Sequence, residues 1–174
     1  LAPFHYKKAK VAYYPPGGPR RGDGDWPEMQ LPLSAEQSVK HMITPAGFEA
    51  RLFAAEPEIR PAIAMSWDAR GRLWICESVD HPNRRQGEGE GHDSIKICED
   101  TDGDGKADHQ EVLFAGFRGG NQQHRVNGLR FGLETGVYLA NGESGGGIRS
   151  MITGETLSIA GRDLRIRPET GAME

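Results

Sequence analysis

The sequence predicts an all-β fold of short antiparallel strands, with one short helix near the N-terminal end. Apolar and polar residues alternate in short runs that recur about every ten residues, which is typical of an up-and-down meander. Glycine (24 residues) and proline (11 residues) make up about a fifth of the 174 residues, compared with roughly 12% in an average protein. These observations favour a chain with many turns and exclude a helical bundle.

The first 30 residues differ in composition from the rest. Residues 1–30 are rich in Pro, Gly, Arg and Lys, so we expect a linker or an irregular N-terminal arm without a core of its own. Residues 31–174 form the predicted domain. It begins with a helix, because Ser34 followed by Gln37 is a capping-box pattern, and this helix is expected to run to about Met42.

Two of the predicted turn-plus-strand segments resemble each other in sequence pattern. Residues 67–74 and 131–138 both have an aromatic residue, a short turn that closes on glycine, and a strand that ends in an aromatic residue. Repetition of this kind is typical of four-stranded propeller blades. We therefore predict a partial β-propeller of about two to three blades. The predicted strands lie at 48–54, 62–67, 73–78, 94–99, 111–115, 128–131, 137–140, 151–159 and 164–167.

Charge and cysteine content narrow the possible partners. The net charge of −4 gives no reason to expect nucleic acid or an anionic membrane surface as a partner. No apolar run is long enough to cross a bilayer. Cys76 and Cys98 either pair across adjacent strands or remain two separate buried thiols, and we predict the second. The chain starts at Leu1 rather than at Met, so we expect a fragment of a longer protein.

Residues 100–111 read Asp-Thr-Asp-Gly-Asp-Gly-Lys-Ala-Asp-His-Gln-Glu. Carboxylates stand at loop positions 1, 3, 5, 9 and 12, and Gly105 at position 6 supplies a sharp turn. This spacing lets a short loop curl around one hard cation, and a ligand set made only of oxygen atoms predicts calcium. The alternative is a solvated acidic turn. The predicted ligands are Asp100, Asp102, Asp104, Lys106 through its backbone carbonyl, Asp108 and Glu111.

The flanks of this loop indicate which kind of calcium site it forms. Residues 94–99 alternate apolar and polar side chains, and residues 111–115 are short and apolar. Neither flank has the length or the 3.6-residue period of a helix. The loop is therefore predicted to join two strands and to fix a turn, and not to act as a calcium sensor that opens helices.

Several motifs together resemble a known family. They are residues 45–49 (Pro-Ala-Gly-Phe-Glu), 52–57 (Leu-Phe-Ala-Ala-Glu-Pro), 67–74 (Trp-Asp-Ala-Arg-Gly-Arg-Leu-Trp), the aspartate loop, and 120–129 (Gly-Asn-Gln-Gln-His-Arg-Val-Asn-Gly-Leu). In this order they resemble the membrane-bound dehydrogenase propellers of planctomycete type. That family is similar to the soluble glucose and sorbosone dehydrogenases that use pyrroloquinoline quinone. The resemblance covers about residues 28–174.

The resemblance implies a fragment of a sugar or alcohol dehydrogenase, hence an oxidoreductase. His124 matches the family's base, which takes the hydroxyl proton while hydride passes to pyrroloquinoline quinone. Glu143, after Gly142, matches the acid that orients this histidine. The implied partners are a small sugar or polyol and a c-type haem acceptor domain in the parent protein. The implied location is periplasmic or otherwise extracytoplasmic, with or without membrane attachment.

Other readings of these residues remain open. His124 is either a base or a turn residue that hydrogen-bonds the backbone, and Glu143 equally suits a turn cluster with Asn141 and Ser144. The family usually carries two aspartate-rich loops, whereas this chain has one, as though a join between repeats removed one blade. A second hypothesis is therefore a non-catalytic, calcium-stabilised propeller that serves as a binding or scaffold module. Three further histidines are expected to be solvent-facing loop residues: His81, His92 and His109.

Overall fold

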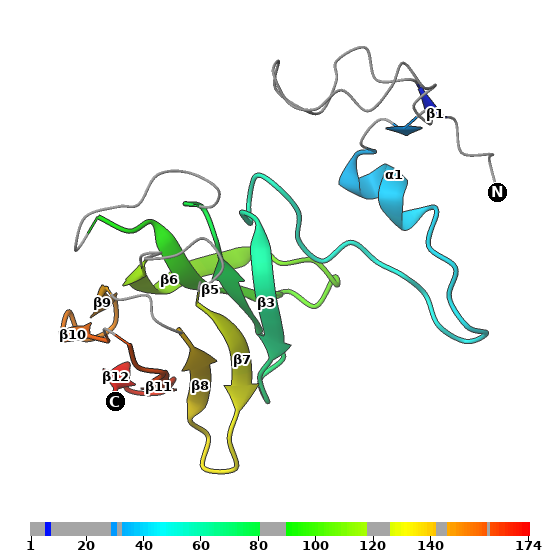
Figure 1. Cartoon of the computed structure of the whole chain (residues 1–174). Coiled ribbons are helices and arrows are strands. Elements are labelled where there is room, and N and C mark those ends of the chain that lie inside the picture. Colours follow the sequence, from blue (N-terminus) through cyan, green and yellow to red (C-terminus); the bar gives the residue numbers. More distant parts are fainter. Residues whose placement is uncertain are drawn as a thin grey trace, which may run out of the picture. The chain divides into compact units, whose positions relative to one another are not determined.

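The computed structural model divides into two units, Leu1–Arg51 and Leu52–Glu174. It describes residues 33–80, 90–117, 126–141, 146–159 and 161–174, together with the backbone of two short strands, β1 (Tyr6–Lys7) and β2 (Met29–Gln30). Figure 1 shows both units, and each is described by itself below.

In the first unit, β1 pairs with β2 in antiparallel fashion, and helix α1 spans Ala35–Val39. The predicted capping box is confirmed: Ser34 Oγ accepts from the Gln37 amide, and Gln37 Oε1 accepts from the Ser34 amide, both at 3.2 Å. The helix is shorter than the sequence indicates. The amides of His41 and Met42 bond the carbonyls three residues earlier, so the last turn tightens, and no residue of α1 is buried to hold a longer helix.

The second unit consists of two antiparallel sheets, which confirms the all-β prediction (Figure 1). The larger sheet has the order β10-β9-β6-β5-β4-β3 and the smaller has β12-β11-β8-β7. Each contains one four-stranded meander, which is the strand order of a propeller blade. The first meander consists of β3 (Ala62–Trp67), β4 (Leu73–Glu77), β5 (Asp93–Glu99) and β6 (His109–Phe117), and the second of β7 (Asn127–Phe131), β8 (Val137–Ala140), β11 (Leu164–Arg167) and β12 (Ala172–Met173).

A hairpin inserted into the second meander belongs to the first sheet. Strands β9 (Gly147–Ser150) and β10 (Thr156–Ser158) follow β8 in the chain, yet β9 pairs with β6. The prediction of one strand over 151–159 is wrong, because residues 151–153 turn and Gly154 has a φ of 78°. The predicted strand over 48–54 is also absent. The hairpin ties the two sheets together through its backbone.

The same alternation that predicts strands selects which aromatic residues are buried. Trp74 has no exposed surface, and its ring meets Phe131 edge-to-face at 5.8 Å, so it packs between the two meanders. Its Nε1 donates to Asp68 at 3.0 Å. Trp67, by contrast, is 52% exposed and packs against Phe53 on the opposite face of the sheet. The main core contains Trp74, Cys76, Ile95, Ile97, Leu113, Phe114, Phe117, Val126, Leu129, Val137, Leu139, Ile148, Ile159, Leu164 and Ile166.

Glu77 is buried, with 2% exposure, on the face of the first meander that points away from the main core. Lys96 Nζ lies 2.8 Å from its carboxylate, Ser94 Oγ donates to it, and so does the Arg60 amide. Lys96 also donates to the Glu58 carbonyl. Burial by itself would raise the pKa of Glu77, but these hydrogen bonds and the Lys96 charge outweigh it and hold the pKa below its usual value.

We predict that Gly116→Ala destabilises the protein more than a matched change at Gly154. Gly116 has a φ of 93°, and an added Cβ would lie 2.5 Å from the Gly147 carbonyl oxygen. Left-handed backbone and a backbone clash together cost roughly 2–4 kcal/mol. Gly154 has a φ of 78° but open space around it, so Gly154→Ala should cost only roughly 1–2 kcal/mol. Urea unfolding checks both variants, and equal losses would contradict the clash.

We also predict that Glu77→Gln makes stability less dependent on acid pH. The folded-state pKa of Glu77 is depressed, so its contribution is complete above the unfolded pKa and is lost as pH falls through the folded pKa. The variant should be less stable by up to about 3 kcal/mol at neutral pH, and the difference should shrink in acid. Glu58→Gln, which keeps its carbonyl, is the control. Urea unfolding over a pH series measures both, and a difference independent of pH would contradict the prediction.

Candidate functional site

The aspartate-rich loop joins strands, as the sequence predicts. It leaves β5 after Glu99 and enters β6 at His109. The Asp108 amide donates to the Glu99 carbonyl at 3.0 Å and closes the base of the loop. The loop is therefore the turn of a long hairpin, and its conformation is coupled to the pairing of β5 with β6.

Three aspartates of this loop converge. One carboxylate oxygen from each of Asp100, Asp102 and Asp104 lies within 4.8 Å of the others. Loop amides hold them in place: Gly103 and Gly105 donate to the two oxygens of Asp100 at 2.7 and 2.9 Å. The amides of Asp104 and Lys106 donate to Asp102 and Asp104. Gly103 and Gly105 have φ values of 81° and 90°, which lets the backbone curl around the carboxylates.

The donor set of this cluster fits a hard cation. All three groups are carboxylate oxygens, which suit calcium or magnesium and not softer metals. Asp102 and Asp104 are exposed and Asp100 is half-buried, so an ion can reach them from solvent. No basic side chain of the described residues forms an ion pair with the three aspartates. Three like charges this close repel one another, and a divalent cation would relieve that repulsion.

The two other predicted carboxylate ligands lie outside this cluster. Asp108 accepts from the Thr101 amide and hydroxyl at 2.9 and 2.6 Å, and these hydrogen bonds hold the pKa of Asp108 below its usual value. Glu111 lies on β6 opposite Ile97. Lys106 is exposed, and its carbonyl remains a predicted ligand. Strand β6 begins at His109, loop position 10. Glu111 is therefore part of an extended strand that leads away from the loop, and not of a helix that would carry its side chain back over the loop.

The predicted base and its partner lie outside the described residues. The segment that holds His124 leaves the described chain after Phe117 and returns at Val126, and the segment that holds Glu143 leaves after Asn141 and returns at Gly146. Phe117, Val126 and Asn141 are buried. Strand β9 runs antiparallel to β6, so the start of β9 lies beside the end of β6. Asn141 follows β8 and is only five residues before Gly146, which precedes β9, so the end of β8 must lie near the same end of the sheets. We call it the polar edge. The aspartate loop lies at the opposite end of β5 and β6.

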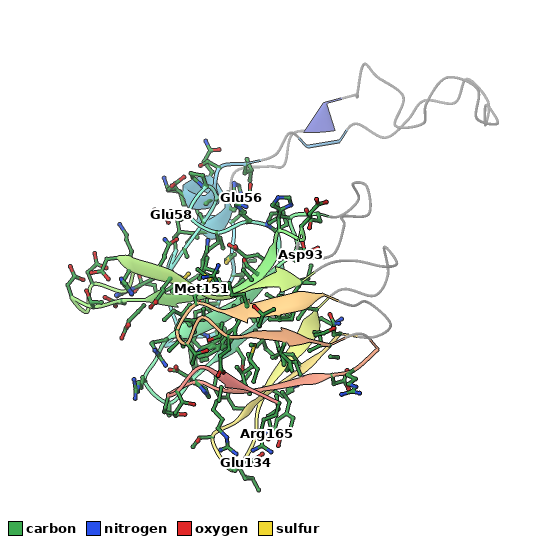
Figure 2. All side chains as sticks on the ribbon, turned by 90° about the vertical axis from the view of Figure 1, so that its left-hand side faces the viewer. Glu56, Glu58, Asp93, Glu134, Met151 and Arg165 are labelled. Atoms are coloured by element: carbon green, nitrogen blue, oxygen red, sulfur yellow. The ribbon has the colours of Figure 1, made fainter. Side chains whose placement is uncertain are left out.

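Buried carboxylates hold a histidine at the polar edge. Asp93, with 1% exposure, accepts from the amides of Val79 and Asp80 at 2.8 and 3.0 Å. Asp80 accepts from the His92 amide at 2.7 Å, and its other oxygen lies 2.9 Å from His92 Nδ1. The His92 side chain is 67% exposed. Figure 2 shows Asp93 at this end of the unit and Glu134, in the β7–β8 turn, at the other.

This pairing leaves His92 able to accept a proton. When Nδ1–H donates to Asp80, Nε2 becomes the free acceptor of a neutral imidazole. The sequence correctly indicates an exposed His92 but gives no sign of its partner. The signal would have been hairpin register: Glu77 pairs with Ser94, and extending the two strands by a few residues brings Asp80 next to His92.

The two cysteines are separate buried thiols, as predicted. Cys76 pairs with Ile95 across the sheet, and Cys98 pairs with Leu73. Burial and the negative charge of Asp93 raise the pKa of Cys76 to about 12. Burial also raises the pKa of Cys98, so neither thiol is suited to act as a nucleophile.

Comparison of the sequence with models of protein families gave one family. The model of a domain of unknown function, DUF7133, matches residues 34–108 and also residues 92–174. The chain belongs to the DUF7133 family. The two matched segments overlap at residues 92–108, which contain β5 and the aspartate loop. No curated protein and no solved structure matched the chain. Among the residues described, no helix combines the length and apolar character that a membrane span requires.

We predict that calcium raises the melting temperature of this DUF7133 protein and that Asp102→Asn removes most of the rise. At a concentration one hundred times its Kd, a ligand adds about 2.7 kcal/mol of stability, which corresponds to roughly 5–10 °C. Asparagine retains the oxygen that accepts from Asp104 but loses the charge. Glu169→Gln, an exposed change outside the loop, is the control. Identical melting curves with calcium and with a chelator would contradict the site.

Proposed function

We propose that this DUF7133 chain is part of a sugar- or alcohol-oxidising β-propeller, with pyrroloquinoline quinone as the hydride acceptor. His124 takes the proton of the substrate hydroxyl, and Glu143 orients its imidazole. One observation carries the proposal: the segments that hold His124 and Glu143 start from buried ends of β6 and β8 at the polar edge. A common edge allows two distant residues to serve one substrate.

The chemistry of this edge supports a role in proton transfer. Asp80, Asp93 and Asn141 are buried there, and polar groups are buried in this way mainly where they position other groups or take part in a reaction. Oxidation of a hydroxyl releases one proton and one hydride, so the site needs a base and a separate hydride acceptor. An imidazole oriented by a carboxylate is such a base near neutral pH.

The described residues assign no binding set for the quinone. Pyrroloquinoline quinone carries three carboxylates. In the described part of the chain, two exposed arginines near the polar edge, Arg149 and Arg162, have no hydrogen-bonded side-chain partner. The proposal therefore rests on the proton acceptor and its orienting acid. A c-type haem domain as the next electron acceptor and an extracytoplasmic location belong to the same proposal.

The double family match supports the interpretation of joined repeats. Residues 92–108 fall within both matched segments. A chain in which the upstream half of one repeat meets the downstream half of the next would produce this overlap, because the shared aspartate loop would align with both copies.

A calcium-stabilised binding or scaffold module is the second candidate. It is favoured by the position of the three converging aspartates, which lie in a hairpin turn at the opposite end of β5 and β6 from the polar edge. At that position an ion stabilises the fold without contacting a substrate at the polar edge. Both candidates predict calcium binding, so only turnover separates them.

We predict that the protein containing this chain, supplied with calcium and pyrroloquinoline quinone, reduces an artificial electron acceptor when given an aldose or a polyol. His124→Ala should abolish this activity, because the hydroxyl proton loses its acceptor, whereas His41→Ala in the first unit should retain it. Dye reduction over a panel of sugars and polyols is the measurement. Quinone binding without turnover on the whole panel would favour the module, and full activity in His124→Ala would exclude it as the base.

A further inference from the structure

An open hollow of about 590 Å³ lies on the larger sheet where β6, β9 and β10 run together. Ile148 and Ser150 of β9 are buried, so the exposed Arg149 between them faces away from the core between the sheets. The hollow is therefore on the outer face of the larger sheet. Its volume falls within the range of small-molecule sites, about 300–1,000 Å³.

Small residues create this hollow. A row of paired residues crosses the sheet from Ser94 to Ala115, Arg149 and Thr156, and Ala115 leaves a gap beside the larger Arg149. Gly116 and Gly147 also line the hollow. An added Cβ at Gly116 would lie 2.5 Å from the Gly147 carbonyl oxygen. The close approach of the two backbones therefore excludes a side chain at Gly116 and keeps the hollow open.

The polar groups around the hollow lack partners. Within the part of the chain that the structure describes, the guanidinium of Arg149 forms no hydrogen bond or ion pair, and neither do the hydroxyls of Thr156 and Ser158. Thr156 pairs directly with Arg149, and Ser158 pairs with Gly147. Since Thr156 and Ser158 are two residues apart on a strand, their side chains lie on the same face. The guanidinium of Arg149 and the hydroxyls of Thr156 and Ser158 therefore lie on the same face of the sheet and line one hollow.

We propose that this hollow binds a small monocarboxylate that carries hydroxyl groups, such as a sugar acid. A guanidinium pairs with a carboxylate through two parallel hydrogen bonds, and threonine and serine hydroxyls both donate to and accept from alcohol groups. A single cation matches one carboxylate better than a phosphate dianion or a polyanion. The inference uses no residue of the proposed catalytic pair and goes beyond the proposed function.

Titration calorimetry of the full chain tests the proposal with D-gluconate as the probe. Sorbitol, acetate and inorganic phosphate separate the contributions of the charge and the hydroxyls. Gluconate should bind more tightly than all three. Arg149→Met should weaken gluconate binding about tenfold or more, because a hydrogen bond to a charged group is lost. Arg162→Met, another exposed arginine, should leave it unchanged.

Two further variants keep the test independent of folding. Thr156→Val combined with Ser158→Ala should weaken gluconate but not acetate. Gly147→Val should abolish binding by filling the hollow: Gly147 does not have a left-handed φ, and an added Cβ would meet only the Thr156 methyl at 3.4 Å. Circular dichroism checks that each variant is folded. Absence of saturable gluconate binding, equal affinity in Arg149→Met, or equal or tighter binding of sorbitol or phosphate would overturn the proposal.

Discussion

The burial of Trp74 between the two meanders is the contact on which the second unit depends. Its ring has no exposed surface and meets Phe131 of β7 edge-to-face, a geometry worth about 0.5–1.5 kcal/mol beyond the buried area. Its indole N–H would be a buried unpaired donor without Asp68, at a cost of roughly 1–3 kcal/mol. Asp68 also accepts from the amides of Arg70 and Arg72. The Asp68 carboxylate thus holds the β3–β4 turn and also fixes Trp74, against which the second meander packs.

The β9–β10 hairpin provides a second connection between the two meanders. It is inserted between β8 and β11, yet it hydrogen-bonds to β6, so it couples the two meanders through backbone as well as through side chains. The hollow beside Arg149 exists only because of this pairing. No pattern in the sequence could predict it, since β6 and β9 are far apart in the chain and the run at 151–159 contains the apolar residues of a single strand.

Patterns among neighbouring residues predict local structure, whereas contacts between residues far apart in the chain cannot be predicted from them. The capping box at Ser34 and the two turn-plus-strand units are read from neighbouring residues, and both correspond to observed elements. Trp67 lies outside the main core, which the sequence does not indicate, because alternation identifies two faces of a strand without saying which one packs on the second meander. Of the five carboxylates that the calcium spacing names, Asp100, Asp102 and Asp104 converge. Asp108 and Glu111 do not join them, since that spacing rule belongs to a loop followed by a helix and here β6 follows.

The direction of β5 separates the cluster of Asp100, Asp102 and Asp104 from the polar edge. Strand β5 runs from Asp93 to Glu99, and at about 3.3 Å per residue its two ends lie roughly 20 Å apart. That distance exceeds the Debye length of about 8–10 Å at physiological salt. The charge of an ion at Asp100 is therefore screened from His92 and from the carboxylates beside it. A bound ion can act on the polar edge only by stabilising the β5–β6 hairpin, whose register positions Asp93 beneath the amides of Val79 and Asp80.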